Sequence, residues 1–159
     1  MTAVAHDGVV QWHYIPACAD TAAPTVAELT AGDRLVGITN YTTPFSESEV
    51  DTSDLDGTYD TAVVGTTKSG PIEITFKRDD TDESGGWDLF TLRDTGFLVR
   101  LPFGGSGAAG VPAASDKAEV YPVQVGQNRP EGYGRNTTQK FMVSFYVTDD
   151  PDTDAAVAA

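Results

Sequence analysis

The chain has 159 residues, 40% of them hydrophobic, and a formal net charge of −14 from 10 basic and 24 acidic residues. This length fits a single domain with its own core, and the hydrophobic content excludes a wholly disordered chain. The shortage of Lys and Arg excludes a protein that grips nucleic acid, because such binding needs clustered cations that displace counterions from phosphates.

One cysteine, Cys18, excludes an internal disulfide and fits a reducing compartment. The N-terminus lacks a basic start followed by an apolar run, so we expect no signal peptide. No stretch approaches the roughly 20 apolar residues that span a membrane. We therefore expect a soluble protein that is made in a cytoplasm.

The N-terminal third is predicted to combine strands with one short helix. Residues 1–8 are small and polar, which indicates a mobile arm. Val9–Ile15 mixes β-branched and aromatic residues and predicts a strand, and Arg34–Asn40 predicts a second one. Between them a short helix is expected after Thr25, because Glu28 three residues later completes a capping box and Gly32 follows as a stop.

The segment Tyr41–Asp60 is predicted to be a long acidic loop. Ser46–Asp60 alone holds six acidic residues and no basic one. A connection of about 20 residues without regular structure is uncommon inside a compact domain and is usually functional or disordered. This loop is the first place to look for a role, although solvation of a loop explains the charge equally well.

The middle of the chain alternates strand and loop signals. Apolar and polar residues alternate over Ile72–Lys77, which predicts a strand with one buried face. Trp87–Arg93 predicts a short amphipathic helix, and Phe97–Leu101 predicts another strand. Gly104–Gly110 predicts a flexible loop.

Two further strands are expected before the C-terminus. Lys117–Val125 alternates again, and Pro122 within it predicts an edge strand or a bulge. Thr138–Thr148 gives the clearest strand signal, and residues 149–159 are expected to form an acidic, then Ala-rich, C-terminal tail. The whole pattern predicts a single mainly β domain over residues 1–159, built as a β-sandwich or partly closed barrel with one or two short helices.

Motifs that carry chemistry are weak in this sequence. Gly105–Gly110 matches GxGxxG, but Pro112 and the strand after it leave no long helix to face a pyrophosphate. The segment that begins at Thr52 resembles a calcium loop but has Val63 where a bidentate Glu is needed. His6, His13 and Cys18 fit no common zinc spacing. We predict no catalytic, cofactor or metal site, and we interpret His13 as a packing residue.

The order of features resembles the tail tube (major tail) proteins of long-tailed bacteriophages, particularly those that infect actinobacteria. The resemblance runs along nearly the whole chain, through segments that include WHYIPA from Trp12, PTVAELTAG from Pro24, GFLVR from Gly96 and VYPVQVG from Val120. It implies a β-sandwich core with a flanking helix. It also implies rings of six subunits whose inner sheets join into one barrel, and rings that stack along the tape measure protein into a tube through which double-stranded DNA passes.

In such a tube the loop after the second strand commonly reaches a neighbouring subunit or ring, which here corresponds to Tyr41–Asp60. The candidate self-assembly residues are therefore Glu47, Glu49, Asp51, Asp54, Leu55, Asp56 and Tyr59. We expect that deleting Ser46–Thr58 abolishes tubes and leaves a folded monomer.

The resemblance implies a virion structural protein that is assembled in the host cytoplasm. The implied partners are further copies of the chain, the tape measure protein, the tail terminator and distal tail proteins, with DNA in the lumen and no membrane. A negative lumen suits sliding DNA, because each cation on a phosphate would add drag. The alternatives are a carbohydrate-binding β-sandwich, a tail terminator that forms a single ring, and, as a remote third, a hydrolase.

Overall fold

A computed structural model describes residues 8–43, 45–52, 62–78, 87–132 and 134–159. Within them it is mainly β, as the sequence predicts. The elements in chain order are β1 (Gln11–Ile15), α1 (Val26–Ala31), β2 (Asp33–Leu35), β3 (Ile38–Thr42), β4 (Phe45–Asp51), β5 (Ala62–Ser69), β6 (Ile72–Lys77), β7 (Thr95–Leu101), the 3₁₀ turn η1 (Ala108–Gly110), β8 (Lys117–Val125), β9 (Arg129–Pro130), β10 (Lys140–Val147) and β11 (Asp152–Ala156).

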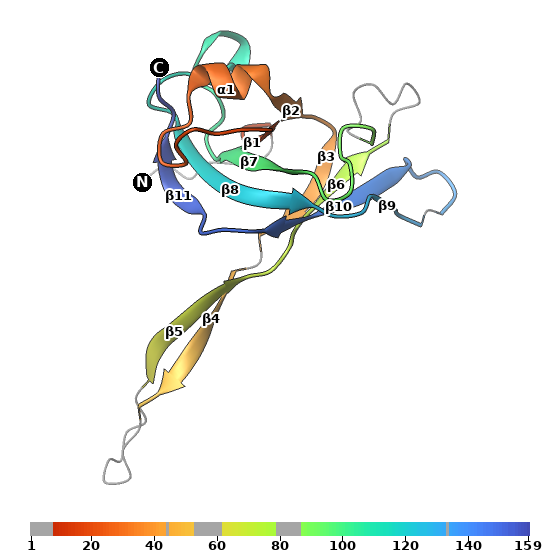
Figure 1. Cartoon of the computed structure of the whole chain (residues 1–159). Coiled ribbons are helices and arrows are strands. Elements are labelled where there is room, and N and C mark those ends of the chain that lie inside the picture. Colours follow the sequence, from red (N-terminus) through yellow and green to blue (C-terminus); the bar gives the residue numbers. More distant parts are fainter. Residues whose placement is uncertain (1–7, 44, 53–61, 79–86, 133) are drawn as a thin grey trace.

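One large sheet forms the body of the molecule, with strand order β2-β1-β7-β8-β10-β6-β3, and the short strands β9 and β11 pair with β10 and β8. The two ends of this order, β2 and β3, are consecutive in the chain and are separated only by Val36 and Gly37. Gly37 has φ +72, a left-handed conformation that glycine adopts without strain and that turns the chain sharply here. The sheet therefore rolls up into the predicted partly closed barrel (Figure 1).

The rolled sheet buries a cluster of apolar side chains on each face. The inner cluster includes Trp12, Phe76 and Phe145. The outer cluster combines alternate residues of β1, β7 and β8, such as Ile15 and Val99, with Leu29 of α1. This division follows from the period-two geometry of strands, which sends neighbouring side chains to opposite faces.

Helix α1 covers the outer cluster and starts as the sequence predicts. Thr25 accepts a hydrogen bond from the Glu28 backbone N–H, and the Glu28 side chain accepts one from the Thr25 N–H, which completes the capping box. The helix ends at Gly32, and Leu29 is its buried residue. The C-terminal segment lies beside it, since the Val26 N–H donates to the Ala158 carbonyl at 3.0 Å.

Three sequence predictions are wrong in this part of the fold. Trp87–Arg93 forms turns instead of a helix, although Phe90 still packs into the inner core. Residues 149–159 are not a tail, because β11 pairs with β8 and Ala155 and Val157 are buried in the outer cluster. β8 is a central strand and not an edge.

Pro122 is tolerated in that central strand because of where its nitrogen points. The Pro122 carbonyl accepts from the Thr148 N–H, so its missing donor faces the irregular junction between β10 and β11. The one ladder bond that Pro122 cannot make is the return bond to the Thr148 carbonyl, at the point where the pairing of β8 with β10 ends. The irregularity that the sequence predicted at Pro122 is thus in the neighbouring strand.

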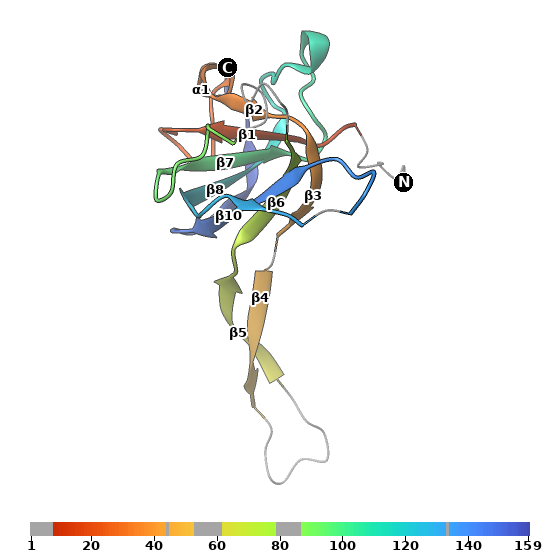
Figure 2. The same cartoon turned by 90° about the vertical axis from the view of Figure 1, so that its right-hand side faces the viewer.

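The strands β4 and β5 form a separate two-stranded hairpin, here called the arm (Phe45–Ser69), of which residues 53–61 lie outside the described residues. It extends away from the barrel in both views (Figures 1 and 2). The acidic segment predicted to be an irregular loop is therefore regular over Phe45–Asp51, and β3 continues to Thr42. The N-terminal segment 1–8, which the sequence predicts to be mobile, lies outside the described residues except for Gly8.

Candidate functional site

The arm is the feature of this fold that has no role in its core. Every residue of β4 is exposed, and β5 is exposed at all positions except the half-buried Gly65. Three of its valines remain in solvent, with exposed fractions of 48% for Val50, 55% for Val63 and 70% for Val64. A two-stranded hairpin by itself is marginally stable at best in water, so this element gains stability from whatever covers it.

The register of the arm places its acidic side chains on one face and the Val50–Val63 pair on the other. Because side chains alternate along β4, Glu47, Glu49 and Asp51 share one face, and Val64 lies opposite Glu49 on that face. Val50 lies opposite Val63 on the other face. A register shift between Glu47 and Glu49 bends the ladder, and Gly65 fits there because a Cβ would approach the Ser48 Oγ to 2.6 Å.

Aromatic contacts fix the base of the arm to the barrel. Tyr41, at the end of β3, packs edge-on against Trp12 with ring centroids 5.2 Å apart. Phe45, at the start of β4, stacks on Tyr121 at 6.0 Å. Such aromatic pairs contribute beyond their buried area, so the direction of the arm is set where it leaves the sheet.

A half-buried ion pair lies beneath these rings. The Arg100 guanidinium donates two hydrogen bonds to the Glu119 carboxylate, at 2.8 and 2.9 Å, and its Nη2 donates to the Tyr41 hydroxyl at 3.3 Å. The Tyr121 hydroxyl donates to the same carboxylate at 2.8 Å. Both charged side chains are largely shielded, with exposed fractions of 15% and 19%. Both bonds to Glu119 come from Nη1, which bridges the two carboxylate oxygens, and such charge-assisted hydrogen bonds are stronger than neutral ones.

The pKa shifts in this cluster follow from burial and from the shared carboxylate. Burial by itself would lower the pKa of Arg100, but the hydrogen bonds to Glu119 and Tyr41 outweigh it and raise that pKa above its usual value. Burial, together with the hydrogen bond to Glu119, also raises the pKa of Tyr121 well above its usual value. Both shifts keep Arg100 charged and the Tyr121 phenol protonated at physiological pH, so these side chains act as a structural cluster.

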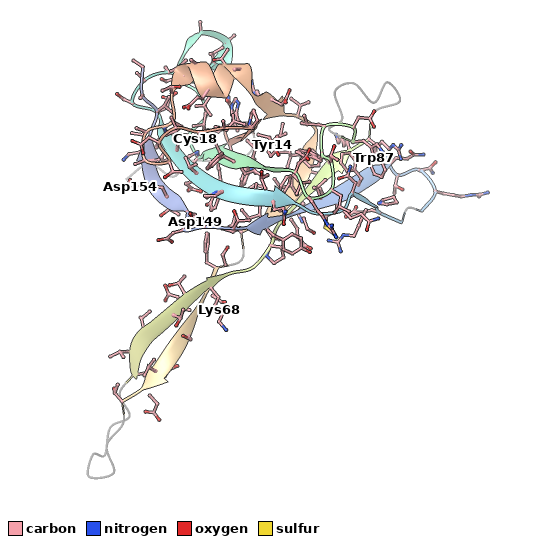
Figure 3. The ribbon with its side chains drawn as sticks, in the orientation of Figure 1. Tyr14, Cys18, Lys68, Trp87, Asp149 and Asp154 are labelled. Atoms are coloured by element: carbon pink, nitrogen blue, oxygen red, sulfur yellow. The ribbon has the colours of Figure 1, made fainter. Side chains whose placement is uncertain are left out.

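A cleft of about 660 Å³ opens between the arm base and the body. Glu47 and Phe45 line it from the arm, and Asp149, Asp150 and Pro151 line it from the β10–β11 junction. Figure 3 shows Asp149 at this junction, above the arm that carries Lys68. Carboxylates thus face one cleft from two different elements.

The structure describes only some of the predicted self-assembly residues. Glu47, Glu49 and Asp51 lie together on the acidic face of the arm. The remaining four, Asp54, Leu55, Asp56 and Tyr59, lie outside the described residues. The assembly role of all seven stays a prediction.

The other motifs occupy ordinary structural positions. The Gly-rich loop holds a single 3₁₀ turn and is followed by β8 instead of a long helix. His13 is buried, with 3% of its surface exposed, in agreement with a packing residue, and its burial lowers its pKa to about 4. His6 lies outside the described residues, and in the part of the chain that is described no three His, Cys, Asp or Glu side chains gather as a metal site.

Sequence reasoning missed the structural cluster at the arm base and the acidic cleft. One signal was available, because Arg100 interrupts the apolar strand Phe97–Leu101 on the inward face that Leu98 also occupies. A charged residue at such a position needs a partner. The contribution of Asp149 and Asp150 had no local signal, since it depends on β11 joining the sheet.

A match to a family model identifies the family of this chain. A model described as "Phage tail tube protein" matches residues 1–159. The chain belongs to the phage tail tube protein family. It is therefore a structural protein of a phage tail and a component of the virion, and family membership points to a non-enzymatic role.

The search of solved structures supports the same fold. A chain of the anti-feeding prophage baseplate, solved by cryo-EM and 6-fold symmetrised, matches with a TM-score of 0.52 at 8% identity. The alignment covers 94% of this chain and 93% of that one. At this identity the likeness concerns the fold alone. No curated protein matches this tail tube family member.

Among the described residues of this tail tube protein, we find no helix with the length and apolar character that crossing a bilayer requires.

Proposed function

We propose that this protein polymerises into stacked six-subunit rings that form the tail tube, the conduit for DNA ejection. The observation that carries the proposal is the arm, an extended hairpin with exposed valines and acidic residues that the core of its own chain does not need. Family membership over the whole chain supports the same role.

Strand edges supply a physical route to self-association. An exposed strand presents unpaired backbone groups that bind another strand, which is a liability for a monomer and an assembly device for a polymer. β3 pairs with β6 on one side, and β4 and β5 pair with each other, so each keeps a second edge that no other described strand covers. In the proposed ring, pairing between the sheets of neighbouring subunits satisfies such edges and joins them into a continuous barrel.

The acidic face of the arm fits the proposed contact with a neighbouring subunit or ring. Its predicted residues Glu47, Glu49 and Asp51 lie on one side of β4, while Val64 adds apolar area on the same side. The net charge of −14 agrees with a lumen that repels phosphates. The proposed partners are further copies of the chain, the tape measure protein, the tail terminator and distal tail proteins. Assembly would take place in the host cytoplasm.

Negative-stain electron microscopy of the purified protein tests the proposal. Uniform hollow tubes with six-fold end views are the expected result. A monodisperse monomer at every protein and salt concentration would overturn it. Single rings that never stack would indicate a tail terminator, and a stable monomer that binds glycans would indicate a carbohydrate-binding module.

A further inference from the structure

The acidic cleft at the arm base contains the kinds of residue that bind a cationic side chain. Glu47 lies on one wall and Asp149 and Asp150 on the other, while Phe45 and Val147 add apolar surface. The Asp149 carboxylate already accepts from the Asp150 backbone N–H at 2.8 Å, which fixes its position. A long basic side chain can pack its aliphatic stem on apolar surface and place its charge against carboxylates.

A free metal ion is a poor occupant of this cleft. Tight binding of a hard cation needs several oxygen ligands gathered around one point. Within the described residues no group of three or more His, Cys, Asp or Glu side chains meets that condition. The carboxylates are spread along two walls, which suits an extended protein segment better than a compact ion.

A protruding loop at the opposite end of β10 carries a matching charge. This loop joins β9 to β10, and Arg135 lies exposed in a turn within it. The Thr137 hydroxyl donates to the Gly134 carbonyl at 2.8 Å, and Asn136 adopts φ 62, a conformation that Asn tolerates. Arg135 is thus exposed on a turn that a hydrogen bond closes.

Three of the other basic residues are engaged within their own chain. Arg100, Lys117 and Arg129 each form an ion pair, with Glu119, Asp154 and Glu73 respectively. Across the part of the chain that is described, no such pair includes Arg135. The chain has only 10 basic residues against 24 acidic ones, so few exposed cations are present to pair with carboxylates of another copy. Arg135 is one that lies on a structured turn.

We infer that the Arg135 turn of one copy docks into the acidic cleft of the next copy. The inference rests on the proposed self-assembly and names a contact within it. The turn precedes β10 and the cleft follows it, about 25 Å apart along a strand of this length. One chain cannot fill its own cleft, so the contact is head-to-tail. Such a contact closes into a ring when the rotation between copies permits it.

Charge reversal tests this contact. Arg135→Glu and the double change Asp149→Arg with Asp150→Arg are each expected to raise the protein concentration needed for assembly at least about tenfold, because each places like charges together. Combining all three changes in one chain restores opposite charges and is expected to restore assembly. Arg93→Glu, which removes the same charge at another exposed position, is the control and should assemble like the wild type.

A cross-link gives a second readout that does not depend on charge. Arg135→Cys and Asp150→Cys are combined in a Cys18→Ser background, so that the two new thiols are the only ones. Oxidation of assembled protein is expected to give a ladder of disulfide-linked dimers and higher oligomers on non-reducing gels. Either single-cysteine variant should stop at dimers.

The outcomes separate the contact from the proposed function. If the wild type forms neither rings nor tubes, the proposed function fails and this contact fails with it. If the wild type assembles but Arg135→Glu behaves like Arg93→Glu, or the two cysteines give no ladder, this contact is overturned while the proposed tube stands.

Discussion

The barrel and the arm differ in what stabilises them. In the barrel, side chains such as Phe141, Val143 and Phe145 are fully buried in one inner cluster. In the arm, Val50, Val63 and Val64 are about half exposed or more, and no second layer covers either face within the described residues. The chain therefore carries a self-sufficient body and an extension that finds few stabilising contacts within its own fold.

Deletion of the arm is expected to have the largest effect. The sequence alone suggested removing Ser46–Thr58, but that deletion would leave β5 without its partner β4. Removing Ser46–Lys68 and joining Phe45 to Ser69 through a short Gly-Ser linker is the better variant, because it keeps the stack of Phe45 on Tyr121. We expect complete loss of tubes with an unchanged thermal transition. Electron microscopy and calorimetry measure the two results, and tubes formed by the armless chain would contradict the proposal.

A pair of matched truncations compares the two regions directly. Phe145→Ala removes a fully buried ring and is expected to cost about 3–5 kcal/mol of unfolding free energy. Val64→Ala removes an exposed side chain and is expected to change that free energy by less than about 0.5 kcal/mol. Chemical denaturation of both variants measures the difference. Similar costs at the two positions would mean that the arm is packed in the free protein.

His13 tests the burial of the barrel through its pH dependence. Burial, reinforced by the nearby Arg34 charge and opposed by the Leu29 backbone, lowers the pKa of His13 from 6.5 to about 4. The unfolded chain therefore binds this proton first as the pH falls. Stability due to the neutral imidazole is complete above about pH 6.5 and declines toward pH 4, by about 2–3 kcal/mol.

Denaturation of the wild type and of His13→Phe between pH 7 and pH 4 measures this contribution. The variant lacks the titrating group, so its stability should fall less over that window. Parallel pH profiles for the two proteins would show that His13 is accessible to solvent in the folded state.

The Arg100–Glu119 pair, which lies in the barrel at the arm base, should show coupling in a double-mutant cycle. Arg100→Leu leaves the Glu119 carboxylate without its guanidinium and is expected to cost about 1–3 kcal/mol, a range reduced for the partial exposure of both groups. Adding Glu119→Leu should recover part of that loss. Additive costs for the two changes, measured by denaturation, would show that the pair does not act as a unit.

The sequence by itself determined the parts of this protein that depend on neighbours along the chain. The alternation of Ile72, Ile74 and Phe76 located β6, and the Thr25–Glu28 capping box located α1, because both signals arise within a few residues. The order of such segments along the chain also carries the family resemblance.

The tertiary structure decided what depends on distant partners. From local sequence β4 is predicted to be an acidic loop, because its partner β5 lies beyond residues 53–61. β11 is likewise predicted to be a tail, because its partner β8 is distant in the sequence. Pro122 predicts an edge strand or a bulge, whereas in the fold it lies in a central strand with its nitrogen toward the β10–β11 junction. In each case backbone pairing with a segment far along the sequence stabilises a conformation that the local composition disfavours. For the same reason the sequence could not reveal that Asp149 and Glu47 share one cleft.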